Sequence, residues 1–218
     1  MHLQIPTVSP DTLGAWLTLA GFGAYHGLNP GMGWLFALAL GLQQSNPSAI
    51  WKAMIPITIG HAGAIALAAA GIVILQAFIS VQTLQLITAV LLIAFGVYKL
   101  FNWYRHPRWT GMKVGWYELV WWSFLMAMAH GAGLMIAPAI LNVTTVPMEH
   151  GMHQAANLNA VLGVGLHTFA MLATMAVVAW LVYKKLGLMV LRQSWFNFDL
   201  VWAVALLIVG SIAFVVTV

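Results

Sequence analysis

The chain of 218 residues contains no cysteine. This absence excludes disulfide bonds, thiolate metal ligands and thiol redox chemistry. Charged residues are also scarce, because Asp, Glu, Lys and Arg together make up 6% of the chain. Soluble globular domains carry about 25% of such residues. The composition therefore excludes an ordinary soluble domain.

Hydrophobic residues take the place of the missing charges. They make up 62% of the chain, and the mean hydropathy is +0.93. This composition predicts an all-α, polytopic integral membrane protein that lies in a lipid bilayer. The first ten residues contain no Lys or Arg, so they lack the positive start of a cleavable signal peptide. No basic patch is interleaved with aromatic residues, so we expect no nucleic-acid partner.

Six apolar stretches are long enough to cross a bilayer at about 20 residues per span. We expect transmembrane helices at about 13–44, 52–78, 83–104, 115–142, 156–183 and 196–218. The first is interrupted near Asn29 and Pro30, because proline donates no backbone hydrogen bond and crowds the carbonyl four residues earlier. The whole chain, 1–218, is thus expected to form a single transmembrane domain.

The positive charges predict how these helices are oriented. All eight Lys and Arg residues fall at or near the loops that join helices one to two, three to four and five to six. Because positively charged loops stay in the cytoplasm, both termini are expected outside, in a bacterial inner (plasma) membrane. Each half contains three helices, which is an odd number. Repeat one (about 13–104) and repeat two (about 115–218) are therefore expected to cross the membrane in opposite orientations. Inverted repeats are common in transporters, with the site near the bilayer midplane.

Four histidines occupy corresponding places in the two halves: His26, His61, His130 and His167. At a rise of about 1.5 Å per residue, each lies ~14–22 Å from the start of its helix, which is near the middle of a ~30 Å apolar core. Each could simply be a core residue bonded to a neighbouring carbonyl. Polar groups at this depth are costly, however, and usually mark a pathway or a site. We therefore expect a shared midplane site.

Metal binding suits the residue types at this site. Neutral imidazole is the commonest protein ligand for nickel, cobalt, copper and zinc, and the thioether of Met32 would add a soft donor. Asn29 could bind the ion through its carbonyl oxygen or support a histidine ligand, and the alternative is a cap at the helix break. The predicted metal set comprises His26, His61, His130, His167, Asn29 and Met32.

A second cluster of donors lies in the external loop between helices four and five. It comprises Met148, Glu149, His150, Met152 and His153. Thioether, carboxylate and imidazole groups at this density could collect copper or zinc outside the membrane. An ordinary polar loop explains the same residues equally well, so both interpretations stay open.

Two segments carry a resemblance to a known family. FGAYHGLNPGMGWLFALALG begins at Phe22, and PITIGHAGAIALAAAG begins at Pro56. They resemble the first half of the nickel/cobalt efflux and urease-accessory transporter family, within a superfamily of small exporters built from inverted three-helix repeats. The resemblance covers residues 21–71 well and the second half weakly. It implies a six-helix divalent-metal transporter with His26 and His61 in the metal path.

The chain departs from the family pattern at two positions. Asn29 stands where an acid is expected, and Met32 stands where a second histidine is expected. Loss of a carboxylate and an imidazole leaves a neutral and softer set of donors, which favours copper(I) or a non-metal ligand over nickel or cobalt. The ion therefore stays open among copper, nickel, cobalt and zinc.

The main functional hypothesis is a membrane transporter or binding protein for a transition-metal ion. We expect no enzyme, because the sequence has no zinc-protease motif, no intramembrane aspartate pair and no dense set of histidine boxes. A b-type haem redox protein is the first alternative, since transmembrane histidines can ligate haem iron. A membrane subunit or scaffold with structural histidines is the second. A homo-oligomer or a partner subunit is left open.

The predicted topology can be tested by labelling single cysteines, since the chain has none of its own. A membrane-impermeant thiol reagent should label Ser9→Cys and Gln154→Cys in intact cells. Thr110→Cys and Gln193→Cys should react only after permeabilisation, because they lie in the basic loops. External labelling of Thr110→Cys would contradict the inverted arrangement.

Overall fold

The computed structural model describes residues 10–102, 115–144, 153–185 and 198–218. Over these residues the chain forms helices and no strand. The elements in chain order are α1 (Pro10–Leu28), the 3-10 helix η1 (Pro30–Met32), α2 (Trp34–Gln43), α3 (Ser48–Leu75), α4 (Val81–Asn102), α5 (Trp116–Ala129), α6 (Ala132–Thr144), α7 (His153–Lys185) and α9 (Phe198–Thr217). The predicted all-α class is therefore confirmed for the described residues.

Several of these helices are suited to cross a membrane. The described part of the chain has four that are long and apolar enough to do so individually: α3, α4, α7 and α9. The bent pair of α5 and α6 makes a fifth if it is counted as one span. The apolar helices indicate an integral membrane protein. A total of six spans requires that α1, η1 and α2 also cross together.

The predicted interruption of the first helix is confirmed. α1 ends at Leu28, and the N–H of Asn29 donates to the carbonyl of His26 at 3.1 Å. The carbonyl that a proline at position 30 would leave unpaired in a continuous helix therefore has a partner. Gly33 follows with φ of 121°, a conformation that side chains rarely adopt. η1 thus separates two helices that the sequence would otherwise join.

A second break corrects the prediction of one continuous helix over residues 115–142. α5 and α6 meet at a bend of 69°. Gly131 lies at the bend with φ of +67°, directly after His130. Glycine adopts this left-handed conformation without a steric penalty. Pro138 lies inside α6 and not at the bend.

The bounds of the two helices that flank the external loop, predicted to end at about 142 and to begin at about 156, are also corrected. α6 continues to Thr144 and α7 begins at His153. The external donors Met148, Glu149, His150 and Met152 lie outside the described residues, and His153 is the first residue of α7.

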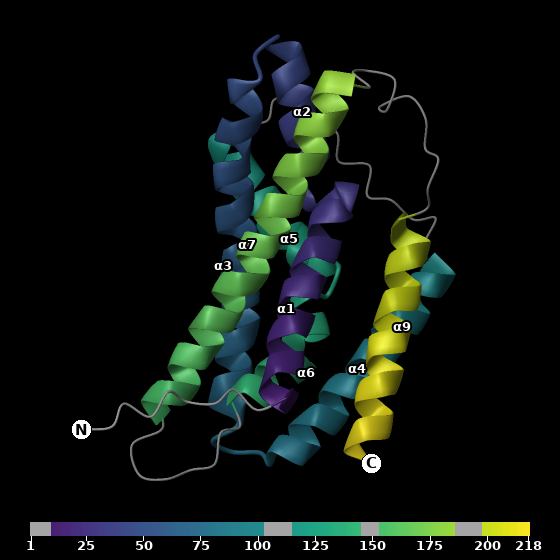
Figure 1. Ribbon diagram of the computed structural model, residues 1–218. Coiled ribbons are helices and arrows are strands. Elements are labelled where there is room, and N and C mark those ends of the chain that lie inside the picture. The colour runs from purple at the N-terminus through teal and green to yellow at the C-terminus, as the bar shows by residue number, and fades with distance from the viewer. Residues whose placement is uncertain (1–9, 103–114, 145–152, 186–197) are drawn as a thin grey trace, which may run out of the picture.

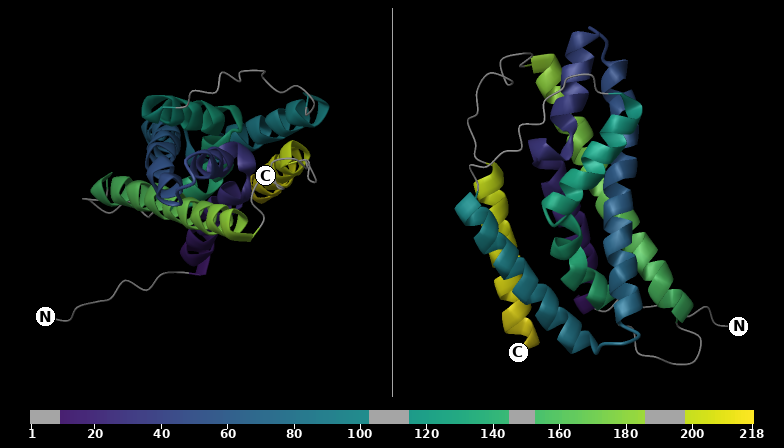
Figure 2. Two further views of the ribbon diagram at one scale, coloured as in Figure 1. Left: turned by 90° about the horizontal axis from the view of Figure 1, so that it is seen from above. Right: turned by 180° about the vertical axis from the view of Figure 1, so that it is seen from behind.

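Three helix pairs build the bundle. α1 packs along α7, α3 along α5, and α4 along α9. The pair of α4 and α9 stands beside the other helices (Figure 1, Figure 2). α1 begins and α9 ends at the same end of the bundle (Figure 1). The described lysines, Lys52, Lys99, Lys184 and Lys185, lie near helix termini that point toward the opposite end.

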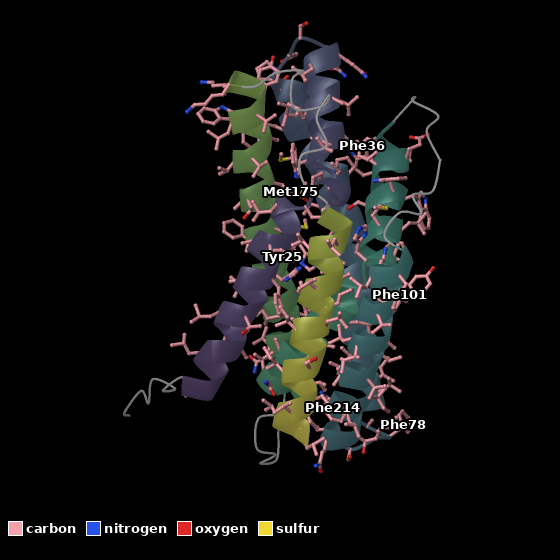
Figure 3. All side chains as sticks on the ribbon, turned by 90° about the vertical axis from the view of Figure 1, so that its right-hand side faces the viewer. Tyr25, Phe36, Phe78, Phe101, Met175 and Phe214 are labelled. Carbon is pink, nitrogen blue, oxygen red and sulfur yellow. The ribbon has the colours of Figure 1, made fainter. Side chains whose placement is uncertain are left out.

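Large apolar side chains cover the outside of the bundle. Phe78 and Phe101 are 81% and 71% exposed. Figure 3 shows them, together with Phe214, around the pair of α4 and α9. Such broad apolar exposure would be unfavourable in water and suits contact with lipid.

Glycines bring the paired helices close together. A Cβ atom at Gly23 would overlap the carbonyl of His167, and one at Gly27 would overlap the carbonyl of Met171. A Cβ atom at Gly60 of α3 would likewise overlap the carbonyl of Val120 on α5. Small residues at such positions let membrane helices approach until their backbones touch. The close contact between α1 and α7 lies next to His26 and His167, and the one between α3 and α5 lies next to His61.

Gly23→Ala should therefore destabilise the protein. The added methyl group must push α1 away from α7, which we expect to cost about 1–3 kcal/mol. Thermal unfolding in detergent would measure the loss. Gly21→Ala is the matched control on the same helix, because a Cβ atom there meets nothing within 4 Å. Equal melting temperatures for the two variants would show that the contact does not hold the helices together.

Candidate functional site

Three of the four predicted site histidines meet inside the bundle. His26 comes from α1, His61 from α3 and His167 from α7. The ring centroid of His26 lies 4.9 Å from that of His167 and 5.6 Å from that of His61. The ring centroids of His61 and His167 are 5.8 Å apart. All three side chains are 0% exposed. We call these three residues the histidine cluster.

Backbone carbonyls fix the tautomer of two members of the histidine cluster. Nδ1 of His26 donates to the carbonyl of Phe22 at 2.7 Å, and Nδ1 of His167 donates across the helix pair to the carbonyl of Leu19 at 3.1 Å. Because a carbonyl only accepts, Nδ1 carries the proton and Nε2 keeps the lone pair. Histidines that bind metals are commonly oriented in this way.

The remaining ring nitrogens of the histidine cluster have no hydrogen-bond partner in the part of the chain that the structure describes. Nε2 of His26, Nε2 of His167 and both nitrogens of His61 make no hydrogen bond to any described residue. A buried polar group left in this state costs about 1–3 kcal/mol. Native structures contain few such groups, and each calls for an explanation. Their concentration on three adjacent rings makes the histidine cluster the candidate functional site.

The spacing of the rings suits a metal ion better than their orientation does. Two imidazoles on one ion, at metal–nitrogen distances of about 2.0–2.1 Å, hold their centroids ~5 Å apart. Within the described part of the chain, however, no group of three or more His, Cys, Asp or Glu residues is arranged to hold an ion. His61 and His167 are stacked at 7°, and lone pairs in parallel planes cannot converge. Coordination would require the ring of His61 to turn, and no hydrogen bond to a described residue anchors this ring.

His130 lies at the second helix break. Its Nδ1 donates to the carbonyl of Met126 at 2.8 Å. This is the same bond, to the residue four positions earlier, that His26 makes in the first half. Its ring lies edge-on to Trp202, with centroids 5.7 Å apart. His130 is therefore connected to the histidine cluster through a tryptophan of α9.

Asn29 and Met32 are explained by local structure. Oδ1 of Asn29 accepts the N–H of Gly31 at 2.9 Å, which is the capping role considered for it from the sequence. Met32 is 1% exposed. It belongs to an apolar cluster with Leu92, Met135, Trp202 and Leu206.

Sequence reasoning missed two aromatic residues beside the histidine cluster. Trp202 lies edge-on to His26 at 4.6 Å and stacks on Tyr25 at 5.3 Å with an angle of 4°. Tyr25 lies at the level where α1 faces α9 (Figure 3). Tryptophans near helix ends are normally anchors at the membrane surface, so the sequence offered no signal for a role of Trp202 inside the bundle.

No family model, curated protein or solved structure matches this chain. The class of protein therefore follows from the molecule itself. Its apolar helices indicate an integral membrane protein, which is helical over the residues that the structure describes. Inside the bundle lies a cluster of buried imidazoles.

His61→Leu should stabilise the ion-free protein. Leucine has a similar volume and removes two buried nitrogens that lack partners, which we expect to raise the free energy of unfolding by about 1 kcal/mol. His167→Leu is the control, because it also removes a hydrogen bond to Leu19. Thermal unfolding in detergent with a metal chelator would compare the two. A lower melting temperature for His61→Leu than for the parent would show that His61 serves packing.

Proposed function

We propose that the protein is a membrane transporter for a transition-metal ion, which binds His26, His61 and His167 inside the membrane. The observation that supports this most directly is the set of buried imidazole nitrogens that have no hydrogen-bond partner among the described residues. Imidazole nitrogen is the ligand type that nickel, cobalt, copper and zinc share. The resemblance of residues 21–71 to nickel and cobalt exporters agrees with this function.

The proposal includes six spans arranged as two inverted repeats. α1, η1 and α2 form the first span, and α5 and α6 form the fourth. In this arrangement α1 corresponds to α5, α3 to α7 and α4 to α9. A two-fold axis that exchanges the halves then converts the pair of α1 and α7 into the pair of α5 and α3. The same axis converts the pair of α4 and α9 into itself, so all three observed packing pairs agree with it. Helix breaks at corresponding places and matching bonds of His26 and His130 support the same correspondence.

The location of the histidine cluster suits transport. Its members come from both halves of the chain, with His26 and His61 from the first and His167 from the second. In inverted-repeat transporters, ions bind between the halves beside broken helices. The one-sided lysines favour a cytoplasmic location for the end at which α7 finishes. Both termini would then lie outside.

The packing is less favourable for the haem alternative. A porphyrin needs a flat cavity between its two axial histidines. Instead, Gly23 and Gly27 bring the backbones of α1 and α7 into contact on either side of His26. Widening this interface for a macrocycle would break the bond from His167 to Leu19. A scaffold role would not explain the nitrogens that lack partners.

Substitution of the cluster by glutamine tests the function. Purified parent protein should bind one of Cu(I), Ni²⁺, Co²⁺ or Zn²⁺, measured by equilibrium dialysis and elemental analysis. His26→Gln, His61→Gln and His167→Gln should each weaken binding at least about 10-fold, because a ligand is lost. The same variants in proteoliposomes should lose uptake of that ion.

Controls separate this function from its alternatives. His106→Gln, in the segment between α4 and α5 that carries Arg105 and Arg108, should bind as the parent does. A Soret band in the parent that disappears in the glutamine variants would favour haem. A parent that binds none of the four ions, together with variants that differ only in melting temperature, would refute metal transport.

A further inference from the structure

Trp202 is the point at which α9 reaches the histidine cluster. It is 1% exposed and ranks among the largest fully buried side chains. α9 otherwise packs mainly along α4 and makes few contacts with α6. A shift of α9 would therefore move the ring of Trp202 inside the bundle.

The indole is held by a hydrogen bond at the second helix break. Nε1 of Trp202 donates to the carbonyl of His130 at 2.6 Å. His130 is the C-cap residue after α5, and Gly131 turns the chain, so the N–H four residues later does not belong to the same helix. The bond fixes the indole and satisfies a buried acceptor at once.

The ring of Trp202 contacts the first half of the chain. It stacks on Tyr25 and lies edge-on to His26 at 4.6 Å. The imidazole of His26 is thus enclosed by Trp202 on one side and by the rings of His61 and His167 on others. Among the described residues the imidazole makes one hydrogen bond, from Nδ1 to Phe22, so these three rings limit how far the imidazole can rotate.

We propose that Trp202 is a positioning residue: its indole holds the imidazole of His26 in the histidine cluster, so that α9 controls the geometry of the site. The part of this inference that concerns ion affinity rests on the proposed function. The contact with His26 depends on the ring, whereas the bond to His130 depends on the indole N–H. The two roles can be separated by substitution.

Trp34 provides a matched control. It is also a buried tryptophan, 5% exposed, and its Nε1 donates to the carbonyl of Leu28 at the first helix break, at 3.1 Å. It packs in an apolar cluster with residues such as Ile57 and Met171. Loss of Trp34 therefore mimics the loss of packing and of a hydrogen bond at Trp202 without removing a ring from His26.

The first experiment compares ion affinities. Ni²⁺, Co²⁺, Zn²⁺ and Cu(I) are each tested alone, and the ion that the parent binds most tightly is used. Trp202→Ala should bind it at least about 10-fold more weakly than Trp34→Ala, the scale seen when support of a ligand is lost. Trp202→Phe keeps a ring, so its affinity should stay within about 3-fold of the parent. Trp202→Phe and Trp34→Phe each lose one indole hydrogen bond, so their melting temperatures should fall by similar amounts.

The second experiment needs no metal. A cysteine introduced as His26→Cys is the only thiol in the chain, and a small methanethiosulfonate reagent reports its accessibility. Labelling should be at least about 10-fold faster with Trp202→Ala than with Trp34→Ala, because only the former removes the ring that encloses position 26.

The two experiments distinguish the failures. Faster labelling in a protein that binds none of the four ions would support the positioning role and refute metal transport. Equal labelling rates in the Trp202→Ala and Trp34→Ala backgrounds, or equal ion affinities of these two variants in a parent that binds metal, would overturn the positioning role.

Discussion

The close contact between α1 and α7 is the constraint on which the rest of the structure depends. It requires glycine at positions 23 and 27, since any side chain there would overlap the backbone of α7. The same approach lets His167 donate to Leu19 and brings its ring to His26. Membrane helices gain little from burial of apolar surface against one another, so tight packing of this kind carries much of their association. The site and the stability of the bundle thus share one interface.

The helix breaks supply the second element of the arrangement. Each break ends a helix near the site and leaves carbonyls that must be satisfied inside an apolar bundle. The first is satisfied by Asn29 and Trp34, and the second by Trp202. Tryptophan suits this role because one side chain fills volume and donates a single hydrogen bond. The breaks thereby connect the site to helices that contribute no histidine.

The histidine cluster illustrates a conflict between stability and function. Three imidazoles in an apolar bundle are costly when their nitrogens lack partners, and a core built for stability alone would contain aliphatic residues there. An ion bound between the rings would offset this cost. Because the rings of His61 and His167 are parallel, coordination of an ion would require rotation of His61, the member that is least restrained by hydrogen bonds.

The sequence by itself determined the helical class, the positions of most helices and the first break, because these depend on apolar composition and on the missing N–H of Pro30. It also selected the histidines that form the cluster, because polar residues in long apolar runs are conspicuous. Only the tertiary structure decided that His26, His61 and His167 meet, and that Trp202 comes between α9 and the site. Such contacts join residues that are distant in the chain, such as Leu19 and His167, which are 148 positions apart. They depend on how glycine and tryptophan fit between helices, which periodicity and composition do not encode.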